Sequence, residues 1–215
     1  MTPFPPTKVK RLASARWIIA ASALILLLLV ISWGWRRPIG GVGGLPIPGE
    51  IVIMVPQFFQ GDPRWSDELL GDTPGTLGGE GCAVASASMA LGFYGMDVDP
   101  GRLNRFLKEN KGYEGRAWLR WESAAEFTPA LVEKAYEDLP SYALIDWNLL
   151  RGNPVIIRIR RPDGITHFVV IVGKRGFDYL IRDPAGYRAA TAGSVYPLVR
   201  LGVPIEALRY YRRIR

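Results

Sequence analysis

The chain contains a single cysteine, Cys82, and a single histidine, His167. A thiolate is a strong nucleophile, and an imidazole beside it can take up and return the proton that acyl transfer requires. Asp183 follows His167 by 16 positions, and a carboxylate next to an imidazole fixes the orientation of the ring and stabilises its charged form. These three residue types can supply the nucleophile, the base and the orienting acid of a covalent reaction at a carbonyl group.

Cys82 stands at the start of a run of small residues that ends at Phe93. The run predicts a helix over residues 82–93, with alanines that allow a neighbouring element to pack closely. A thiol at the first residue of a helix feels the positive end of the helix dipole, which favours the thiolate. The glycines of the preceding GGEG leave room for a substrate backbone to approach the thiol.

Two apolar segments determine where the imidazole and the carboxylate lie. His167 begins the segment HFVVIVG, and Asp183 follows the segment YLIR. A hairpin that turns near residues 174–176 brings both residues to the same end, because each lies eight positions from residue 175. We therefore expect His167 and Asp183 to be neighbours on adjacent strands.

The remaining pattern predicts helices first and an antiparallel sheet afterwards. A capped helix begins after Asp99 with Pro100, and further helices are predicted around residues 128–139 and over residues 141–152. Alternating residues from Val155 onwards predict strands joined by short turns. This order is typical of an α+β domain of two packed layers.

The N-terminal part contains a stretch that is suited to a membrane. Residues 17–35 include no charged side chain, and tryptophans stand at both ends of this stretch. A helix of 19 residues spans about 28 Å, close to the thickness of the hydrocarbon core of a bilayer. Bulky and charged residues follow it instead of a small-residue cleavage site, so we expect an uncleaved transmembrane helix.

The charges around this stretch indicate its orientation. Four basic residues precede it and two follow it, which predicts a cytoplasmic N-terminus (1–16) and an extracytoplasmic domain. Residues 1–37 carry six basic and no acidic residues, so nearly all of the net charge of +7 belongs to this region. The rest of the chain is almost neutral, which argues against a nucleic-acid partner.

A segment rich in glycine and proline follows the apolar stretch. Residues 36–49 read as a flexible linker, and residues 50–215 as one globular domain. A single cysteine excludes a disulfide within the chain, so the domain depends on its apolar core.

Five segments of this domain resemble papain-like cysteine peptidases related to the bacteriocin-leader-processing (double-glycine) peptidases. They are VPQFFQGDPRW, TLGGEGCAVASASMALGFYGMDVDPGRLNRFL, GNPVIIRIR, THFVVIVG and YLIRDP, in the order of that family. The resemblance implies a papain-like fold, with N-terminal helices packed on a C-terminal antiparallel sheet. It also implies a thiol peptidase that acts on a peptide or protein.

The resemblance assigns a role to each candidate residue. Cys82 corresponds to the nucleophile, His167 to the base and Asp183 to the orienting acid. A glutamine upstream of the cysteine supplies an oxyanion-hole donor in the family; Gln60 matches it best, and Gln57 is the weaker candidate. No cofactor and no metal ion is implied.

Two other functions remain open at this level. A cell-wall amidase or peptidase of the NlpC type shares the order of cysteine and histidine, but such enzymes commonly use a second histidine, and this chain has only one. An inactive peptidase fold that serves as a binding module on the membrane is the third hypothesis. The presence of all three candidate side chains argues against it.

Overall fold

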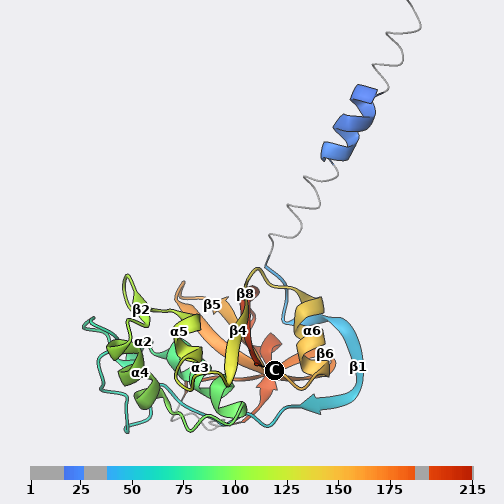
Figure 1. Cartoon of the computed structure of the whole chain (residues 1–215). Helices are drawn as coiled ribbons and strands as arrows, with labels where there is room; N and C mark the ends of the chain where they lie inside the picture. Colours follow the sequence, from blue (N-terminus) through green and yellow to red (C-terminus); the bar gives the residue numbers. More distant parts are fainter. Residues whose placement is uncertain (1–16, 27–37, 187–193, 215) are drawn as a thin grey trace, which may run out of the picture. The chain divides into compact units, whose positions relative to one another are not determined.

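The structure is a computed structural model, and it describes residues 17–26, 38–186 and 194–214. The chain divides into two compact units, Met1–Arg37 and Pro38–Arg215. Figure 1 shows the chain coloured along the sequence.

In the first unit, residues 17–26 are helical and their side chains are exposed. Among the helices of the described residues, none is both long and apolar enough to span a membrane. The second half of the predicted transmembrane helix, residues 27–35, lies outside the described residues. The anchor therefore stays a prediction.

The second unit contains five helices, one 3₁₀ turn and eight strands among its described residues. Their bounds are β1 (Val42–Val52), α2 (Leu77–Glu80), α3 (Cys82–Phe93), α4 (Pro100–Glu109), β2 (Tyr113–Glu114), β3 (Trp118–Leu119), α5 (Trp121–Ala125), β4 (Val132–Asp138), α6 (Tyr142–Leu150), β5 (Val155–Arg160), β6 (Thr166–Arg182), β7 (Tyr196–Pro197), η1 (Leu198–Leu201) and β8 (Ile205–Arg213).

An antiparallel sheet forms the centre of this unit. Its strand order is β1-β6-β5-β8-β4, and the short β7 pairs with β6. Helices α2 to α5 group on one side and α6 on the other, next to β1 (Figure 1). The predicted α+β class with an antiparallel sheet is confirmed.

The central helix α3 starts and ends where the sequence predicted. Nine of its 12 residues are buried. This is possible because the side chains of α3 itself are small or apolar on every face of the helix. Two buried serines stay satisfied: Ser86 donates to the carbonyl of Phe168 (3.2 Å), and Ser88 to that of Val84 (2.9 Å). The rest of the domain can therefore pack around α3, and this packing fixes the position of its first residue, Cys82.

The prediction of a helix around residues 128–139 is wrong, because Val132–Asp138 form strand β4. Ala130 has a left-handed φ of 60°, which ends any helical turn before the strand. The strand pairs along β8, and Tyr136 stacks on Tyr210 with the ring centroids 5.9 Å apart. Pairing with a neighbouring strand overrides the local preference of Glu, Lys and Ala for a helix.

The predicted linker 36–49 is also wrong from residue 42 onwards, and the domain begins at Pro38 instead of residue 50. Residues 42–52 form the edge strand β1, which pairs with β6. Its glycines serve close packing: a Cβ on Gly43 would lie 2.5 Å from the ring of Tyr142, and one on Gly44 would overlap the carboxylate of Asp146. Glycine in this segment therefore does not indicate flexibility.

A buried ion pair fastens β1 to the rest of the domain. Lys174 and Asp146 are 0% and 2% exposed, and their Nζ and Oδ1 atoms are 2.6 Å apart. Lys174 also donates to the carbonyl of Gly43 (2.7 Å), and Asp146 accepts from the backbone N–H of Leu45 (2.6 Å). Tyr179 donates to the same carboxylate (2.9 Å), so the pair is fully hydrogen-bonded.

Replacing Lys174 by methionine should destabilise the folded chain by about 3–5 kcal/mol, because the carboxylate of Asp146 would stay buried without its cation. Chemical unfolding of the full chain, followed by circular dichroism, measures this loss. The adjacent Arg175 pairs with Glu50 at the surface, so Arg175→Gln is a matched control that should cost at most about 1 kcal/mol. Equal losses in the two variants would contradict the role of the buried pair.

Candidate active site

The structure brings His167 and Asp183 together, as the hairpin pattern predicted. His167 Nε2 and Asp183 Oδ1 are 2.7 Å apart. The two residues stand at opposite ends of β6, a strand of 17 residues that would be about 55 Å long if it were straight. The strand must therefore reverse its direction, and Gly176, with a left-handed φ of 57°, lies at the middle of that reversal.

Asp183 is held as a carboxylate by a set of donors. The backbone N–H of Ala185 donates to Oδ1 and the hydroxyl of Tyr196 to Oδ2, each at 2.8 Å. Burial acts to raise the pKa of Asp183, but the hydrogen bond and charge of His167, followed by the bonds from Ala185 and Tyr196, lower it below its ordinary value. The carboxylate can therefore orient the imidazole throughout the neutral range.

His167 lies between this carboxylate and the thiol of Cys82. Nε2 faces Asp183, which leaves Nδ1 as the ring nitrogen for the hydrogen bond with Cys82. Burial acts to lower the pKa of His167, but the hydrogen bonds and negative charges of Asp183 and Cys82 raise it to about 9. The arrangement thus favours an imidazolium beside the thiol at neutral pH.

Cys82 occupies the first position of α3 and is 8% exposed. No side chain caps this helix, whose N-cap is Gly81, so the positive end of the helix dipole faces the thiol. Of the preceding glycines, Gly79 leaves space, because among the described residues a Cβ there would meet only Thr76 Oγ1, at 3.5 Å, whereas Gly78 and Gly81 do not. A Cβ on Gly81 would overlap the carbonyl of Leu77, and one on Gly78 would lie 2.9 Å from the carbonyl of Ser66, so both accommodate the protein's own backbone.

Gln60 links the segments that carry the thiol and the carboxylate. Its side-chain Nε2 donates to the carbonyl of Gly78 (2.9 Å), in the approach to Cys82, and its backbone N–H donates to the carbonyl of Pro184 (2.9 Å). Its Oε1 is buried and has no hydrogen-bond partner among the described residues. Gln57 instead donates to the carbonyl of Asp183 (3.0 Å) and accepts from Arg182 (3.3 Å). Gln60 is thus the glutamine on the side of the thiol.

Tyr196 is a site residue that the sequence did not reveal. It reaches Asp183 because β7 pairs with β6, with Tyr196 opposite Ile181. A two-residue strand has no recognisable period, so no sequence pattern could have placed this hydroxyl. Burial and the adjacent carboxylate raise the pKa of Tyr196 above its ordinary range, which keeps the hydroxyl a donor to Asp183.

The single imidazole gives a direct test of these electrostatics. We expect the NMR signals of His167 in the full chain to titrate near pH 9, and Cys82→Ser or Asp183→Asn to lower the midpoint, because each removes a negative charge. With both substitutions, burial is the remaining influence on the pKa of His167, and burial lowers it, so the midpoint should fall below 6.5. An unchanged midpoint in these variants would contradict the contacts of the ring.

The raised pKa of His167 also determines how the stability of the folded chain depends on pH. The folded chain binds the proton of His167 more tightly than the unfolded chain, whose imidazole titrates near 6.5. The contribution of the imidazolium to stability is therefore complete below about pH 6.5 and is lost as the pH rises through about 9.

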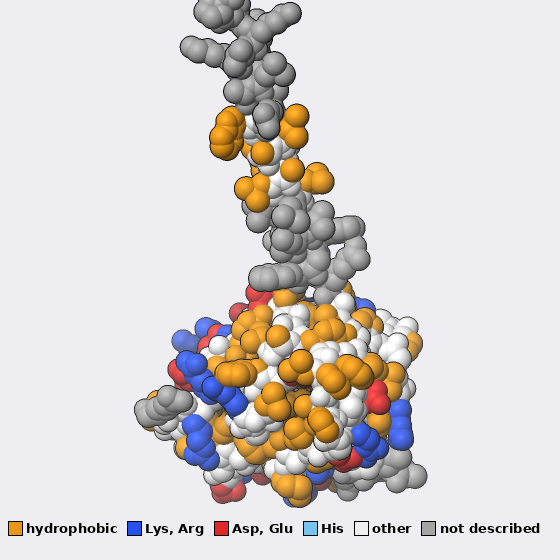
Figure 2. Space-filling view, turned by 90° about the vertical axis from the view of Figure 1, so that its right-hand side faces the viewer, with side chains coloured by type: hydrophobic (Ala, Val, Ile, Leu, Met, Phe, Trp, Pro, Cys, Tyr) orange, Lys and Arg blue, Asp and Glu red, His pale blue; other side chains and the backbone are white. Residues whose placement is uncertain are grey.

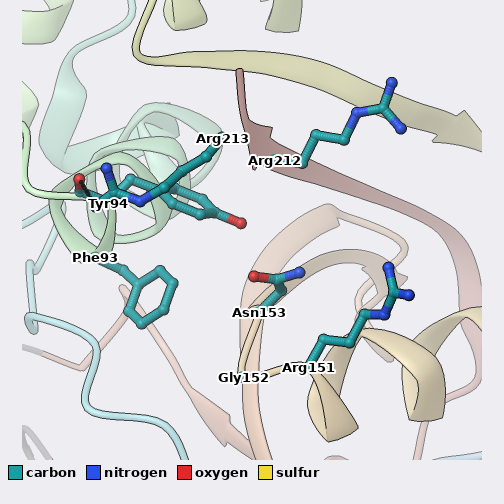
Figure 3. A pocket seen from close by; sticks show the side chains of 7 residues that line it. All are labelled: Phe93, Tyr94, Arg151, Gly152, Asn153, Arg212 and Arg213. Atoms are coloured by element: carbon teal, nitrogen blue, oxygen red, sulfur yellow. Dashed lines mark hydrogen bonds between the residues drawn. The ribbon is translucent and has the colours of Figure 1, made fainter. Parts of the chain in front are cut away.

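A separate pocket of about 310 Å³ lies at the other end of α3. Its lining residues are Phe93, Tyr94, Arg151, Gly152, Asn153, Arg212 and Arg213 (Figure 3). A helix of 12 residues is about 18 Å long, so the thiol of Cys82 lies outside this pocket. Within residues 17–26, 38–186 and 194–214, no group of three or more His, Cys, Asp or Glu side chains could hold a metal ion.

Comparison with known proteins finds a matching family and similar solved structures. Residues 52–211 match the model of a family described as "Peptidase_C39 like family". A crystal structure provisionally described as a C39-like peptidase from Bacillus anthracis is 17% identical, with a TM-score of 0.49; the match covers 78% of this chain and 100% of that chain. No curated protein matches the sequence significantly.

Proposed function

The chain belongs to the Peptidase_C39 like family, and we propose on this basis that it is a thiol peptidase that cleaves peptide bonds through Cys82, His167 and Asp183. The observation that carries the proposal is that His167 contacts Asp183 at 2.7 Å and is hydrogen-bonded to Cys82, the first residue of α3. The imidazole is 5% exposed and hydrogen-bonded on both sides, so its position is restricted. A restricted base next to a thiol is the minimal apparatus for covalent acyl transfer.

In the first step the thiolate of Cys82 attacks the carbonyl carbon of the peptide bond. The π electrons move to the carbonyl oxygen, and this negative charge is stabilised by the Cys82 N–H and the amide of Gln60. When the tetrahedral intermediate collapses, the C–N bond breaks, and the imidazolium of His167 gives its proton to the leaving amine. An acyl-thioester on Cys82 remains.

In the second step the neutral imidazole takes a proton from a water molecule, and the hydroxide formed attacks the thioester carbonyl. The C–S bond breaks, the carboxylic acid product leaves, and the thiolate and the imidazolium are restored. Asp183 stabilises the ring whenever it is charged and stays ionised throughout. Tyr196 and Ala185 act through Asp183 as positioning residues, because they hold both of its oxygens.

The two glutamines allow a matched test of the oxyanion donor. Gln60→Ala should reduce turnover by about 100- to 1000-fold, the usual cost of losing one oxyanion-hole donor. The titration of His167 should stay nearly unchanged, because the pKa of His167 is set by burial, Asp183 and Cys82. Gln57→Ala removes a side chain of equal size and should cost much less. A larger loss from Gln57→Ala would reverse the assignment.

The proposal is tested by peptide hydrolysis. The full chain and its Cys82→Ser variant are incubated with a peptide library and with soluble cell-wall muropeptides, and products are identified by mass spectrometry. Cleavage of ordinary peptide bonds by the wild-type chain alone supports a peptidase. Cleavage confined to muropeptides would favour a cell-wall amidase, and binding without products would favour an inactive module.

We also propose that residues 17–35 anchor the protein in the membrane, with the catalytic domain on the extracytoplasmic side. The support is the absence of charge over 19 residues, the tryptophans at both ends and the excess of basic residues before the stretch. Protease added to spheroplasts should digest the domain. Protection of the domain until lysis would contradict this orientation.

A further inference from the structure

Hydrogen bonds hold the first residues of the catalytic domain against the rest of the domain. Ile39 and Ile205 exchange two backbone hydrogen bonds, at 3.1 and 2.7 Å. The backbone N–H of Gly40 then donates to the hydroxyl of Tyr142 at 3.0 Å, and the buried Lys174 binds the carbonyl of Gly43. The hydrogen bonds that hold the N-terminal end of the domain therefore begin at Ile39, one residue after Pro38.

This attachment limits how far the domain can move from an anchored segment. The uncharged stretch ends at Trp35, and four peptide steps (39 − 35) separate it from Ile39. Even a fully extended chain covers only about 3.5 Å per residue, so these steps span at most about 14 Å. If Trp35 lies at the membrane–water interface, Ile39 must lie close to the headgroups.

The side of the domain that carries β1 and α6 has several large apolar side chains exposed. Exposed fractions there are 43% for Val42, 60% for Leu45, 54% for Trp147 and 54% for Leu150. We call these four residues the apolar face. Figure 2 looks at this side and shows hydrophobic side chains gathered across its centre, with charged side chains toward the margins. Contiguous exposed apolar surface marks a place where a protein meets a partner or a membrane.

The chemistry of the face fits lipid better than a protein strand. Trp147 and Leu150 are three positions apart on α6, so both lie on one side of the helix. The guanidinium of Arg151 lies 4.1 Å from the ring of Trp147, and tryptophan with arginine is typical of the headgroup region. Pro46 and Pro48 remove two N–H donors from the edge strand β1, which disfavours pairing with a strand of another protein.

Basic residues continue beyond the end of α6. In Figure 3 the side chains of Arg151 and Arg212 extend in the same direction beside the pocket, and Arg213 lies along Tyr94. Guanidinium groups attract the phosphates of anionic lipids. Arg212 is paired with Glu133, with Nε and Oε1 2.6 Å apart, so the positive charge beside the apolar face rests on Arg151, which lies over the ring of Trp147.

We propose that the apolar face rests on the outer surface of the membrane, with Trp147 and Leu150 among the lipid headgroups. This inference rests on the proposed anchor but not on the peptidase activity. The short connection after Trp35 holds the domain at the membrane, and the apolar face determines which side turns toward the lipid.

Nitroxide labelling of the full chain tests the orientation. In a Cys82→Ser background, a cysteine is introduced at one position at a time by Trp147→Cys, Trp118→Cys or Leu24→Cys, and labelled. Trp118 is a matched control, because it is a tryptophan of 71% exposure on the hairpin β2–β3, away from α6 and β1. The proteins are placed in nanodiscs of phosphatidylglycerol and phosphatidylcholine in equal parts. Electron paramagnetic resonance then compares collisions with oxygen, which concentrates in lipid, and with a water-soluble nickel chelate.

The proposal predicts an oxygen-to-nickel collision ratio several-fold higher at position 147 than at position 118, with the highest ratio at position 24. A high ratio at 24 with equal, low ratios at 147 and 118 would overturn the docking and leave the anchor intact. A low ratio at 24 would overturn the anchor, and the docking with it. Neither result depends on peptide hydrolysis, so failure of the peptidase proposal is recognised separately by the hydrolysis experiment.

Discussion

Replacing His167 by alanine should reduce kcat/KM for peptide hydrolysis by about 10⁶-fold, the scale of loss when the base of a catalytic triad is removed. The physical reason is that this single imidazole is hydrogen-bonded to the thiol and carries the proton to the leaving amine. Cys82→Ser should cause a similar loss, because a serine hydroxyl is not ionised by a neighbouring imidazolium. Progress curves on the best substrate from the peptide library measure both effects.

The double variant distinguishes one catalytic unit from two independent contributions. Cys82→Ser combined with His167→Ala should be no slower than either single variant, because the two groups act together. Circular dichroism of each variant checks that the fold is retained. Losses that multiply, or a His167→Ala chain with nearly full activity, would show that the imidazole does not serve the thiol.

Replacing Asp183 by alanine should reduce kcat by about 10⁴-fold, the usual cost of losing the orienting acid. Without the carboxylate, Nε2 loses its 2.7 Å partner and the imidazolium loses a negative charge beside it. The activity that remains should also fall off at lower pH on the alkaline side, because the pKa of His167 decreases when Asp183 no longer raises it. A pH–rate profile of both chains measures this shift.

Two further substitutions serve as controls for the loss of activity and the shifted pH profile of Asp183→Ala. Tyr196→Phe removes one donor to Asp183 and keeps the charge, so it should cost much less than Asp183→Ala and should leave KM nearly unchanged. Asp163→Ala removes an exposed carboxylate in the turn before β6 and should have no effect on the pH profile. Equal profiles for Asp183→Ala and wild type would contradict the role of Asp183.

The elements that carry the thiol and the imidazole were predictable because their signals are local. A run of small residues predicted α3 to the residue, and Asp99 with Pro100 predicted the start of α4, where the Asp99 side chain accepts from the N–H of Arg102 (2.8 Å). The symmetric spacing around residue 175 predicted the meeting of His167 and Asp183. The resemblance to papain-like peptidases agrees, at the level of the family, with the match to the Peptidase_C39 like family.

The wrong or missing predictions concern contacts between residues that are far apart in the sequence. Residues 132–138 become a strand because β8 offers a partner some 70 positions later, and no local pattern contains that information. Gly43 and Gly44 suggested a flexible linker, but they are required by Tyr142 and Asp146, about 100 positions away. Tyr196 was missed for the same reason, because its contact with Asp183 depends on the pairing of β7 with β6.

Covalent labelling tests whether Cys82 is a nucleophile that His167 activates. The full chain is incubated at neutral pH with a peptidyl acyloxymethyl ketone, and the mass of the intact protein is followed with time. Because the chain has one cysteine, a single added mass reports Cys82 alone. We predict rapid single labelling of the wild-type chain, none of Cys82→Ser, and very slow labelling of His167→Ala, although iodoacetamide should alkylate the unfolded wild-type and His167→Ala chains equally. Equal labelling rates for the folded wild-type and His167→Ala chains would show that His167 does not activate the thiol.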